Sequence, residues 1–384
     1  MKLKYLCSSF STPLAQSEVK DEGLYKVYGA SGLVGYLDTY SMSKPYLGIV
    51  KDGAGVGRVN CYNSNSSLLG TLAYIIPNER ADINWLKYVI TSLDLGKDVG
   101  KTTIPHIYFS EYGNRDVSHY VSVEQQRRLA TFLDAECSRI DAVIEQTRAT
   151  IEEYKKLRQS VITQAVIKGI RSNRKMKGSG IEWIGEIPEE WDCINPKALF
   201  SQRKDRAIPG ERQLTASQQY GVIYQDEYME RTGSKVVTVE KDFDILKHVE
   251  AGDFVISMRS FQGGLEYSTN TGSISSAYVM LVPNLDKVFP QYYRWLLKSD
   301  VYINALQSTS NMVRDGQAMR YSNFAQVRLI TVPMDEQKEI ANYLDEKCFS
   351  MEKLIELKER FLAEIESYKK SLIYEYVTGK KEVV

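Results

Sequence analysis

The residues of this chain that could perform chemistry are few, and their spacing forms no recognisable catalytic motif. The glycine-rich stretch GAGVG at Gly53–Gly57 comes nearest to a phosphate-binding loop. It is not GxGxxG, it lacks a following GK[ST], and no helix pattern follows it, so a glycine-rich hairpin or bulge is favoured. The three histidines, His106, His119 and His248, belong to no HExxH motif, and no GxSxG elbow is present.

Two further kinds of chemistry are not supported either. The stretch INPKAL, which begins at Ile194, lacks the second proline and the aromatic residue with which a methyltransferase holds its flipped base, and there is no Walker motif for a motor. The five cysteines have no CxxC spacing and are predicted to be small core residues: Cys7, Cys61, Cys137, Cys193 and Cys348. We therefore predict no catalytic residue and no metal site in this chain.

Length and composition limit the class of protein. A chain of 384 residues predicts two or three domains, and 26% charged with 43% hydrophobic residues is an ordinary globular composition. Lys plus Arg equals Asp plus Glu at 49 each, so any basic surface must be local. No apolar run approaches ~18 residues and the start MKLKYLCSSF is not a secretory signal, so we expect a cytoplasmic protein without a membrane partner.

A long internal repeat organises the chain. Residues 124–168 align without a gap with residues 335–379, at a shift of 211, and 11 of the 45 positions are identical. The identical pairs are Gln126/Gln337, Ala130/Ala341, Leu133/Leu344, Asp134/Asp345, Cys137/Cys348, Ile144/Ile355, Glu145/Glu356, Glu153/Glu364, Ser160/Ser371, Ile162/Ile373 and Val166/Val377. A repeat of this period indicates a duplicated half rather than a solenoid.

Apolar residues in both copies recur with the 3.5-residue period that is typical of coiled coils. The predicted helix-seam residues are Leu133, Ile140, Ile144, Ile151, Val161, Leu344, Met351, Ile355, Leu362, Ile365 and Leu372. Both copies interrupt the seam at matched places, Thr147/Lys358 and Arg158/Lys369. This matching favours two helices, each about 65 Å long, that pack against each other. Two separate surface helices are the alternative.

The remaining sequence predicts two compact α/β domains. IIPNERADINWLKYV near Ile75 is similar to LVPNLDKVFPQYYRWLL near Leu281, and each predicts a strand, a turn and an amphipathic helix. The predicted boundaries are a domain at 1–121, a helix at 122–170, a linker at 171–190, a domain at 191–333 and a helix at 334–380. Five basic residues between Lys168 and Lys177 either contact phosphate or are solvated in the linker.

This order of domain and helix resembles the specificity subunit of type I restriction-modification systems. The resemblance is carried by EQQRRLATFLD (Glu124–Asp134), DEQKEIANYLDEK (Asp335–Lys347), the tails SVITQAVIKG and SLIYEYVTGK, and GSGIEWIGEIPEEW (Gly178–Trp191). It covers essentially the whole chain. The family commonly enters the first helix with a proline pair; this chain has YVSVEQQ there and TVPMDEQ before the second helix.

The resemblance implies an α+β fold in which two globular α/β target-recognition domains are separated by two long antiparallel coiled-coil helices, as an internal pseudo-twofold duplication. Each domain would read one half of a split target in double-stranded DNA, while the helices set the spacing and dock two modification subunits. Those subunits would use S-adenosylmethionine to methylate adenine, and motor-nuclease subunits would use ATP and Mg. The chain itself would be non-catalytic, with no cofactor of its own.

Base discrimination requires Arg or Lys for guanine, and Asn or Gln for adenine, on loops. The predicted DNA-binding residues of the first domain are Tyr28, Ser31, Lys51, Arg58, Lys101, Thr103 and His106. Those of the second domain are Arg203, Lys204, Arg206, Gln218, Gln219, Arg259, Ser260, Gln262, Arg314, Gln317 and Arg320. The loops YGASGLVGY and KDGAGVGRV of the first domain have no clear twin in the second, so an asymmetric target is expected.

A coiled-coil adaptor whose two globular domains bind proteins is the alternative from another class. It explains the neutral net charge better, but it does not explain why polar loops diverge on a repeated scaffold. A self-sufficient DNA enzyme would need a methyltransferase or nuclease motif, and the sequence contains none.

Overall fold

The computed structural model describes residues 1–53, 55–97, 105–239, 243–309 and 319–383. The chain divides into two compact units: Met1–Ala149 with Lys358–Val384 form unit 1, and Thr150–Leu357 form unit 2. Helix α3 (Val123–Lys168) and helix α9 (Met334–Val377) each contribute one half to each unit. Both helices lie within the segments predicted to be long helices.

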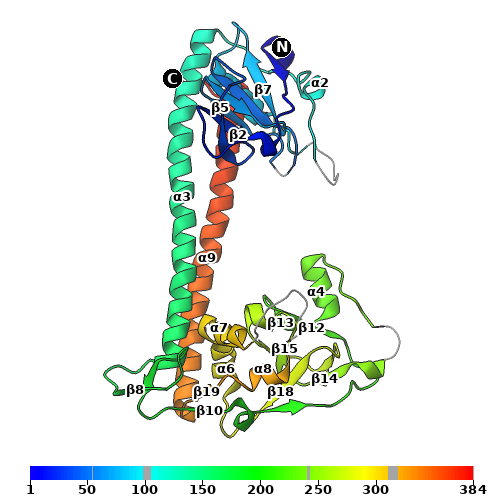
Figure 1. The fold of residues 1–384 in the computed structure, drawn as a ribbon, viewed down its shortest axis with the longest axis vertical. Helices are drawn as coiled ribbons and strands as arrows, with labels where there is room; N and C mark the ends of the chain where they lie inside the picture. Colours follow the sequence, from blue (N-terminus) through cyan, green and yellow to red (C-terminus); the bar gives the residue numbers. More distant parts are fainter. Residues whose placement is uncertain (54, 98–104, 240–242, 310–318, 384) are drawn as a thin grey trace. The chain divides into compact units, whose positions relative to one another are not determined.

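The two long helices pack against each other in both units, so the alternative of separate surface helices is wrong. In unit 1, the first half of α3 lies beside the second half of α9 (Figure 1), and Leu133, Ile140 and Leu372 share one hydrophobic cluster. In unit 2, Ile162 of α3 and Leu344 of α9 share another. The predicted seam residues are all buried or half-buried. Burial of one such side chain stabilises the fold by about 1.5–3 kcal/mol.

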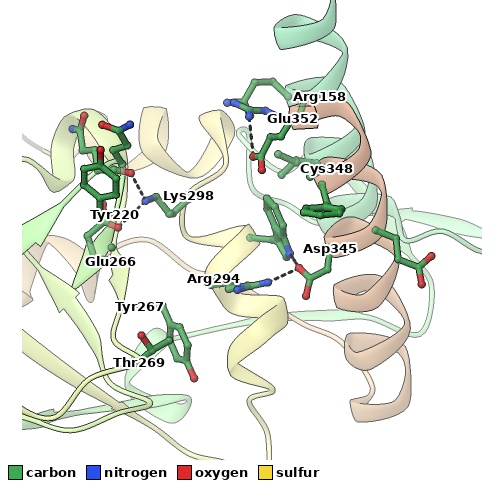
Figure 2. A pocket seen from close by; sticks show the side chains of 18 residues that line it. Arg158, Tyr220, Glu266, Tyr267, Thr269, Arg294, Lys298, Asp345, Cys348 and Glu352 are labelled. Carbon is green, nitrogen blue, oxygen red and sulfur yellow. Dashed lines mark hydrogen bonds and ion pairs between the residues drawn. The ribbon is translucent and has the colours of Figure 1, made fainter. Parts of the chain in front are cut away.

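Charged residues at a predicted seam interruption form matched ion pairs across the helices. In unit 1, Lys369 Nζ donates to both carboxylate oxygens of Asp141, each at 2.6 Å. In unit 2, Arg158 Nη1 donates to Glu352 at 3.0 Å (Figure 2). The repeat aligns Asp141 with Glu352 and Arg158 with Lys369, so the same ion pair occurs once in each unit. Charged residues near a seam favour one alignment of two helices over the others.

Substitution Lys369→Glu is expected to destabilise unit 1, because it places two carboxylates opposite each other. The side chains are 27% (Lys369) and 53% (Asp141) exposed, so the expected loss in the free energy of unfolding is about 1 kcal/mol. The exchanged double variant Asp141→Lys, Lys369→Glu should recover most of that loss in urea unfolding. A double variant no more stable than the single variant would show that this pair does not couple the helices.

Two β-sheets form the globular part of unit 1. A four-stranded antiparallel sheet has the order β1-β7-β4-β5, and a three-stranded sheet has the order β3-β2-β6 with β2 parallel to β6. The elements are 3-10 turns at Leu3–Tyr5 and Gln16–Glu18, β1 (Cys7–Phe10), β2 (Tyr25–Gly29), β3 (Gly32–Leu37), β4 (Tyr46–Val50), β5 (Val59–Tyr62), β6 (Ser66–Leu68), β7 (Leu72–Pro77), α1 (Ile83–Ser92) and α2 (Phe109–Tyr112). Helix α1 begins where the Asp82 side chain accepts hydrogen bonds from the backbone N–H groups of Asn84 and Trp85.

Unit 2 is built on a second four-stranded sheet, of order β11-β18-β15-β16, with four two-stranded ribbons. Its strands are β8 (Met176–Gly178), β9 (Glu186–Pro188), β10 (Asp192–Ile194), β11 (Phe200–Arg203), β12 (Leu214–Ser217), β13 (Gly221–Tyr224), β14 (Lys247–Val249), β15 (Phe254–Ile256), β16 (Glu266–Tyr267), β17 (Gly272–Ile274), β18 (Val279–Pro283) and β19 (Leu329–Thr331). Its helices are α4 (Gln225–Thr232), α5 (Ser260–Gly263), α6 (Pro290–Leu296), α7 (Asp300–Ser308) and α8 (Tyr321–Phe324), with 3-10 turns at Pro196–Ala198 and Phe243–Ile245.

The two four-stranded sheets have the same connectivity. In each, the first strand in sequence pairs with the fourth, the fourth with the second, and the second with the third. The fourth strand, β7 or β18, leads into the helix α1 or α6 in both units. The two similar sequence stretches near Ile75 and Leu281 therefore form the strand, turn and helix that they predict. The duplication extends from the long helices into the globular domains.

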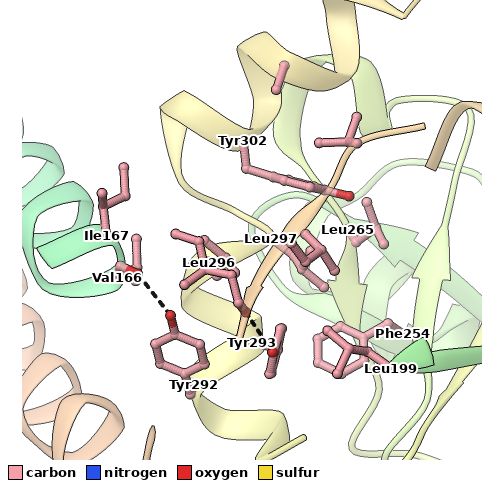
Figure 3. Close-up of a cluster of buried hydrophobic side chains, with 14 of the residues drawn as sticks. Val166, Ile167, Leu199, Phe254, Leu265, Tyr292, Tyr293, Leu296, Leu297 and Tyr302 are labelled. Atoms are coloured by element: carbon pink, nitrogen blue, oxygen red, sulfur yellow. Dashed lines mark hydrogen bonds between the residues drawn. The ribbon is translucent and has the colours of Figure 1, made fainter. Parts of the chain in front are cut away.

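Each globular domain shares its core with both long helices. In unit 2, Val166 and Ile167 at the end of α3 belong to the same buried cluster as Tyr292, Tyr293 and Leu296 of α6 (Figure 3). Tyr292 Oη also donates a hydrogen bond to the Val166 carbonyl at 2.8 Å. In unit 1, residues of α1, of the start of α3 and of the end of α9 share one cluster.

The linker between α3 and the second domain contains the short hairpin of β8 and β9. Two of its basic residues form ion pairs with the first turns of α9: Arg171 with Glu339 at 2.8 Å, and Arg174 with Glu336. Arg171 Nη2 also lies 3.4 Å from Asp335. These contacts favour a structural role for both arginines over the contact with phosphate.

Candidate nucleic-acid interface

Three of the predicted DNA-binding residues of unit 1 gather around the loop that follows β4. Gly53 and Gly57 lie in the turn of the β4–β5 hairpin, as the sequence predicts, and both have φ near +85°. The Lys51 carbonyl accepts the Ile107 N–H at 3.1 Å, which brings His106 to the same loop. Arg58 is exposed and lies over Gly55, where an added Cβ would collide with its guanidinium.

Tyr28 and Ser31 lie on the neighbouring hairpin of β2 and β3. Tyr28 is half-buried and its carbonyl accepts the Leu69 N–H at 2.9 Å, while Lys51 N–H donates to the Thr71 carbonyl at 3.1 Å. The short segment 69–71 therefore holds both groups in one region of unit 1. Ser31 is exposed at the tip of the hairpin. The predicted residues Lys101 and Thr103 lie outside the described part of the chain.

In unit 2, a second polar cluster is formed by the β12–β13 turn and α5. Gln218, Gln219, Arg259 and Gln262 are exposed there. Gln218 Nε2 lies 3.5 Å from the Arg259 carbonyl, and its side chain covers Gly263 so closely that an added Cβ would meet it at 2.6 Å. The cluster therefore contains amide side chains, which can form hydrogen bonds with adenine, and a guanidinium, which can form hydrogen bonds with guanine.

Two predicted contacts in unit 2 are contradicted by the geometry. Arg203 uses both edges of its guanidinium in ion pairs with Asp253, Glu250 and Asp205, and its side chain is only 12% exposed. Ser260 is fully buried, and its Oγ accepts the Ser257 N–H at 2.9 Å. Arg203 and Ser260 therefore stabilise the fold, and neither has a free group to offer a base.

The remaining predicted residues of unit 2 are surface cations. Lys204 and Arg206 are exposed after β11, and Arg320 is exposed at the start of α8. Burial, together with the nearby charge of Arg206, lowers the pKa of Lys247. The predicted Arg314 and Gln317 lie outside the described residues.

Sequence reasoning missed three residues that the structure adds to these clusters. The Asp52 carboxylate contacts His106 Nδ1, and the Tyr108 ring lies 4.1 Å from the His106 ring, centre to centre. Met258 is 50% exposed beside Arg259. Asp52 could not be predicted from the sequence, because its partner His106 lies 54 residues away and no local pattern connects the two. Met258 could have been predicted, because it is adjacent to the predicted residue Arg259.

A cavity of about 1020 Å³ lies in unit 2 between the globular domain and the two helices (Figure 2). Six of its charged residues form three ion pairs: Lys298 with the buried Glu266 at 2.7 Å, Arg294 with Asp345, and Arg158 with Glu352. Burial raises the pKa of Glu266, and Lys298 opposes that rise.

Metal-ligand groups, cysteine thiols and membrane-spanning helices were sought in the described part of the chain. Among these residues, no three His, Cys, Asp or Glu side chains are placed to hold a metal ion, and none of the helices is both long enough and apolar enough to cross a membrane. Burial raises the pKa of the Cys7 thiol to about 12 and of the Cys348 thiol to about 11, so both stay protonated in the core. Cys137 is also buried and Cys193 half-buried, but Cys61 is exposed, so the prediction of a core position is wrong for Cys61.

Comparison with solved structures identifies the fold. The chain matches, at 13% identity and a TM-score of 0.65, a chain of the structure described as "Structural basis underlying complex assembly and conformational transition of the type I R-M system", covering 99% of this chain and 97% of that one. This match confirms the predicted fold class. No protein-family model matches the sequence, and no curated protein matches it.

Two further matches are to structures named as specificity subunits. One is the type I restriction-modification S subunit from M. genitalium, with 14% identity, a TM-score of 0.42, and 98% and 95% of the two chains covered. The other is the HsdS subunit from Thermoanaerobacter tengcongensis, with 12% identity, a TM-score of 0.47, and 99% and 96% covered.

Proposed function

We propose that this chain is the DNA-recognition subunit of a type I restriction-modification complex. The observation that carries the proposal is the fold shared with a chain of such a complex over 99% of the present chain. Each globular domain reads one half of a bipartite DNA target, and the long helices set the spacing between the halves. This shared fold favours DNA recognition over the alternative of a protein-binding adaptor.

The two polar clusters support an asymmetric target. Unit 1 offers Lys51, Arg58 and His106 at the loop between β4 and β5, whereas unit 2 offers Arg259 and Gln262 between the equivalent strands β15 and β16, with further glutamines on the separate β12–β13 ribbon. Cationic and amide side chains have different preferences among the base edges of the major groove. Two domains with one scaffold and different loops therefore read different half-sites.

Exposed apolar residues on the long helices support docking of two copies of one partner. Val143 of α3 and Leu354 of α9 occupy equivalent positions of the repeat, as do Leu157 and Tyr368, and all four are 39–56% exposed. They lie outside the seam that joins the helices. Apolar side chains that recur on a helix face favour another helix as partner. Because each unit carries one copy of this pattern, the two modification subunits of the complex fit it.

The chemistry of the complex then belongs to its partner subunits. The modification subunits bind S-adenosylmethionine and flip the target adenine for methylation, and motor-nuclease subunits use ATP and Mg. The present chain contributes recognition, spacing and assembly without a cofactor of its own.

Single-molecule sequencing of adenine methylation tests the proposal directly. DNA is exposed to the chain together with its cognate modification subunits, and then to those subunits alone. A split, asymmetric methylated motif that disappears without the chain is the expected result. If no such motif appears and the assembled complex also fails to bind DNA, the chain is a protein adaptor and the proposal is wrong.

Substitutions Arg58→Ala and Arg259→Ala are expected to act on different half-sites. A bidentate contact between arginine and guanine contributes about 1–3 kcal/mol, so each variant should lose roughly 10- to 100-fold in methylation of the native target and accept other bases at one position. Sequencing of the methylated motif measures this change. The matched control is Arg139→Ala, which removes a 77% exposed arginine from α3 and should leave the motif unaltered. A motif unaffected by both loop variants would exclude these arginines as base contacts.

A further inference from the structure

The repeat contains two buried glutamines whose position in the fold explains their identity. Gln126 of α3 is 0% exposed and Gln337 of α9 is 1% exposed, and the two occupy equivalent positions. Both lie in the first turns of the long helix that follows a globular domain. Neither belongs to the apolar seam between the helices, so coiled-coil packing does not account for them.

Gln126 holds three backbone groups in unit 1. Its Oε1 accepts the N–H of Asp82, the residue that caps α1, at 2.8 Å. Its Nε2 donates to the Arg80 carbonyl at 3.0 Å and to the Val121 carbonyl at 2.9 Å. One amide thus joins the domain helix α1 to the chain that enters α3. A side chain needs two donors, one acceptor and this length to make all three bonds, and only glutamine provides them.

Gln337 makes the same three bonds in unit 2. Its Oε1 accepts the N–H of Phe289, the residue that caps α6, at 2.7 Å. Its Nε2 donates to the Lys287 and Val332 carbonyls, both at 2.8 Å. In both units, one carbonyl partner lies two residues before the helix cap, and the other lies five residues before the glutamine. This set of three hydrogen bonds, which we call the clamp, is therefore the same in both units, although the surrounding domain sequences differ.

A second duplicated contact reinforces each clamp two turns further along. Asp134 accepts hydrogen bonds from Lys87 Nζ at 3.1 Å and from Tyr88 Oη at 2.6 Å, both on α1. Its repeat partner Asp345 accepts from the Arg294 guanidinium and from Trp295 Nε1 at 2.8 Å, in the strand-following helix α6. Each domain helix is thus tied to its long helix at two points, which fixes its direction as well as its position.

We propose that Gln126 and Gln337 are positioning residues that fix each recognition domain on its long helix and thereby set how strictly the spacing between half-sites is read. This inference rests on the function proposed above. One base pair changes the separation of two half-sites by about 3.4 Å and rotates one half-site about the DNA axis. A domain that could tilt on its helix would accept such a change, whereas a clamped domain rejects it.

The test uses the full chain with its modification subunits and a DNA library in which both half-sites are fixed and the spacer is native, one base pair shorter or one base pair longer. Gln126→Met and Gln337→Met remove the amide while keeping an unbranched side chain of similar volume. Each variant is expected to reduce the preference for the native spacer by about tenfold, with the half-site bases unchanged. The control Lys338→Met replaces an exposed polar side chain next to Gln337 with the same residue type and should keep the wild-type preference.

Equal loss of methylation at all three spacers, with the preference unchanged, would show a merely structural role and overturn the inference. Asp134→Ala and Asp345→Ala provide a second measurement if the buried variants do not fold, because these side chains are 46% and 38% exposed. They should shift the preference in the same direction, and an unchanged preference in both would also overturn the inference. A wild-type complex that methylates no split target would contradict the proposed function instead, so the two failures are distinguishable.

Discussion

Glu336→Ala is expected to lower the free energy of unfolding of unit 2 by about 3 kcal/mol, because it removes the buried counter-charge of Arg174 and leaves only the exposed Glu190 to pair with it. The Glu336 side chain is 1% exposed and pairs with Arg174, which is 10% exposed. Its Oε2 also accepts a hydrogen bond from Trp191 Nε1 at 3.0 Å. The substitution therefore leaves the indole N–H unpaired inside the protein and Arg174 with its exposed partner Glu190 alone.

Urea unfolding of the complete chain measures this loss. The matched control is Glu339→Ala, three residues along the same helix, whose carboxylate pairs with Arg171 and is 48% exposed. An exposed pair contributes only about 0–1 kcal/mol, so the two variants should differ clearly. Similar losses in both would mean that the buried cluster around Trp191 does not stabilise the junction of the linker with α9.

A heptad inserted into each long helix is expected to lengthen the spacer of the DNA target by about three base pairs. Seven helical residues add about 10 Å, and B-DNA advances about 3.4 Å per base pair. The insertions belong directly before Arg158 in α3 and directly after Glu352 in α9, because these residues pair with each other across the helices. A whole heptad keeps the apolar seam on the same face of both helices.

Sequencing of the methylated motif reads the result of this insertion. The spacer should change while the bases of both half-sites remain the same, and methylation at the original spacing should be lost. A four-residue insertion into α3 alone should also change the spacing of the half-sites while leaving the bases of each half-site unchanged, because it lengthens one helix by about 6 Å and only locally unwinds the coiled coil. A change in the recognised bases would contradict the division of labour between domains and helices.

The sequence carried clear information about the long helices and less about the domains. A 3.5-residue period over several heptads depends only on local spacing, so Leu133, Ile140 and Leu344 could be assigned to a seam from their spacing alone. The matched charges at Arg158 and Lys369 even indicated that the two seams share one geometry. Of the domain elements, only the strand, turn and helix near Ile75 and Leu281 repeated strongly enough to predict.

Candidate base contacts could be predicted by residue type but not by accessibility. Arg58 and Arg259 are exposed as expected, whereas Arg203 and Ser260 have the same chemical character and are committed to the fold. The partners of Arg203 at Glu250 and Asp253 lie about 50 residues away, and no local pattern records such pairs. Burial of a polar side chain is decided by these distant partners.

The plan of the molecule, with two domains, two long helices and an internal duplication, could be predicted before folding, because hydrophobic period and internal repetition are properties of residue order alone. The tertiary structure alone decided what the identical residues of the repeat do. Gln126 and Asp134 were identical to Gln337 and Asp345 in the alignment, but their partners in the globular domains are backbone groups and side chains 44 to 51 residues away. Only the folded domains bring those partners to the helices, so the role of these residues as domain anchors became visible in three dimensions.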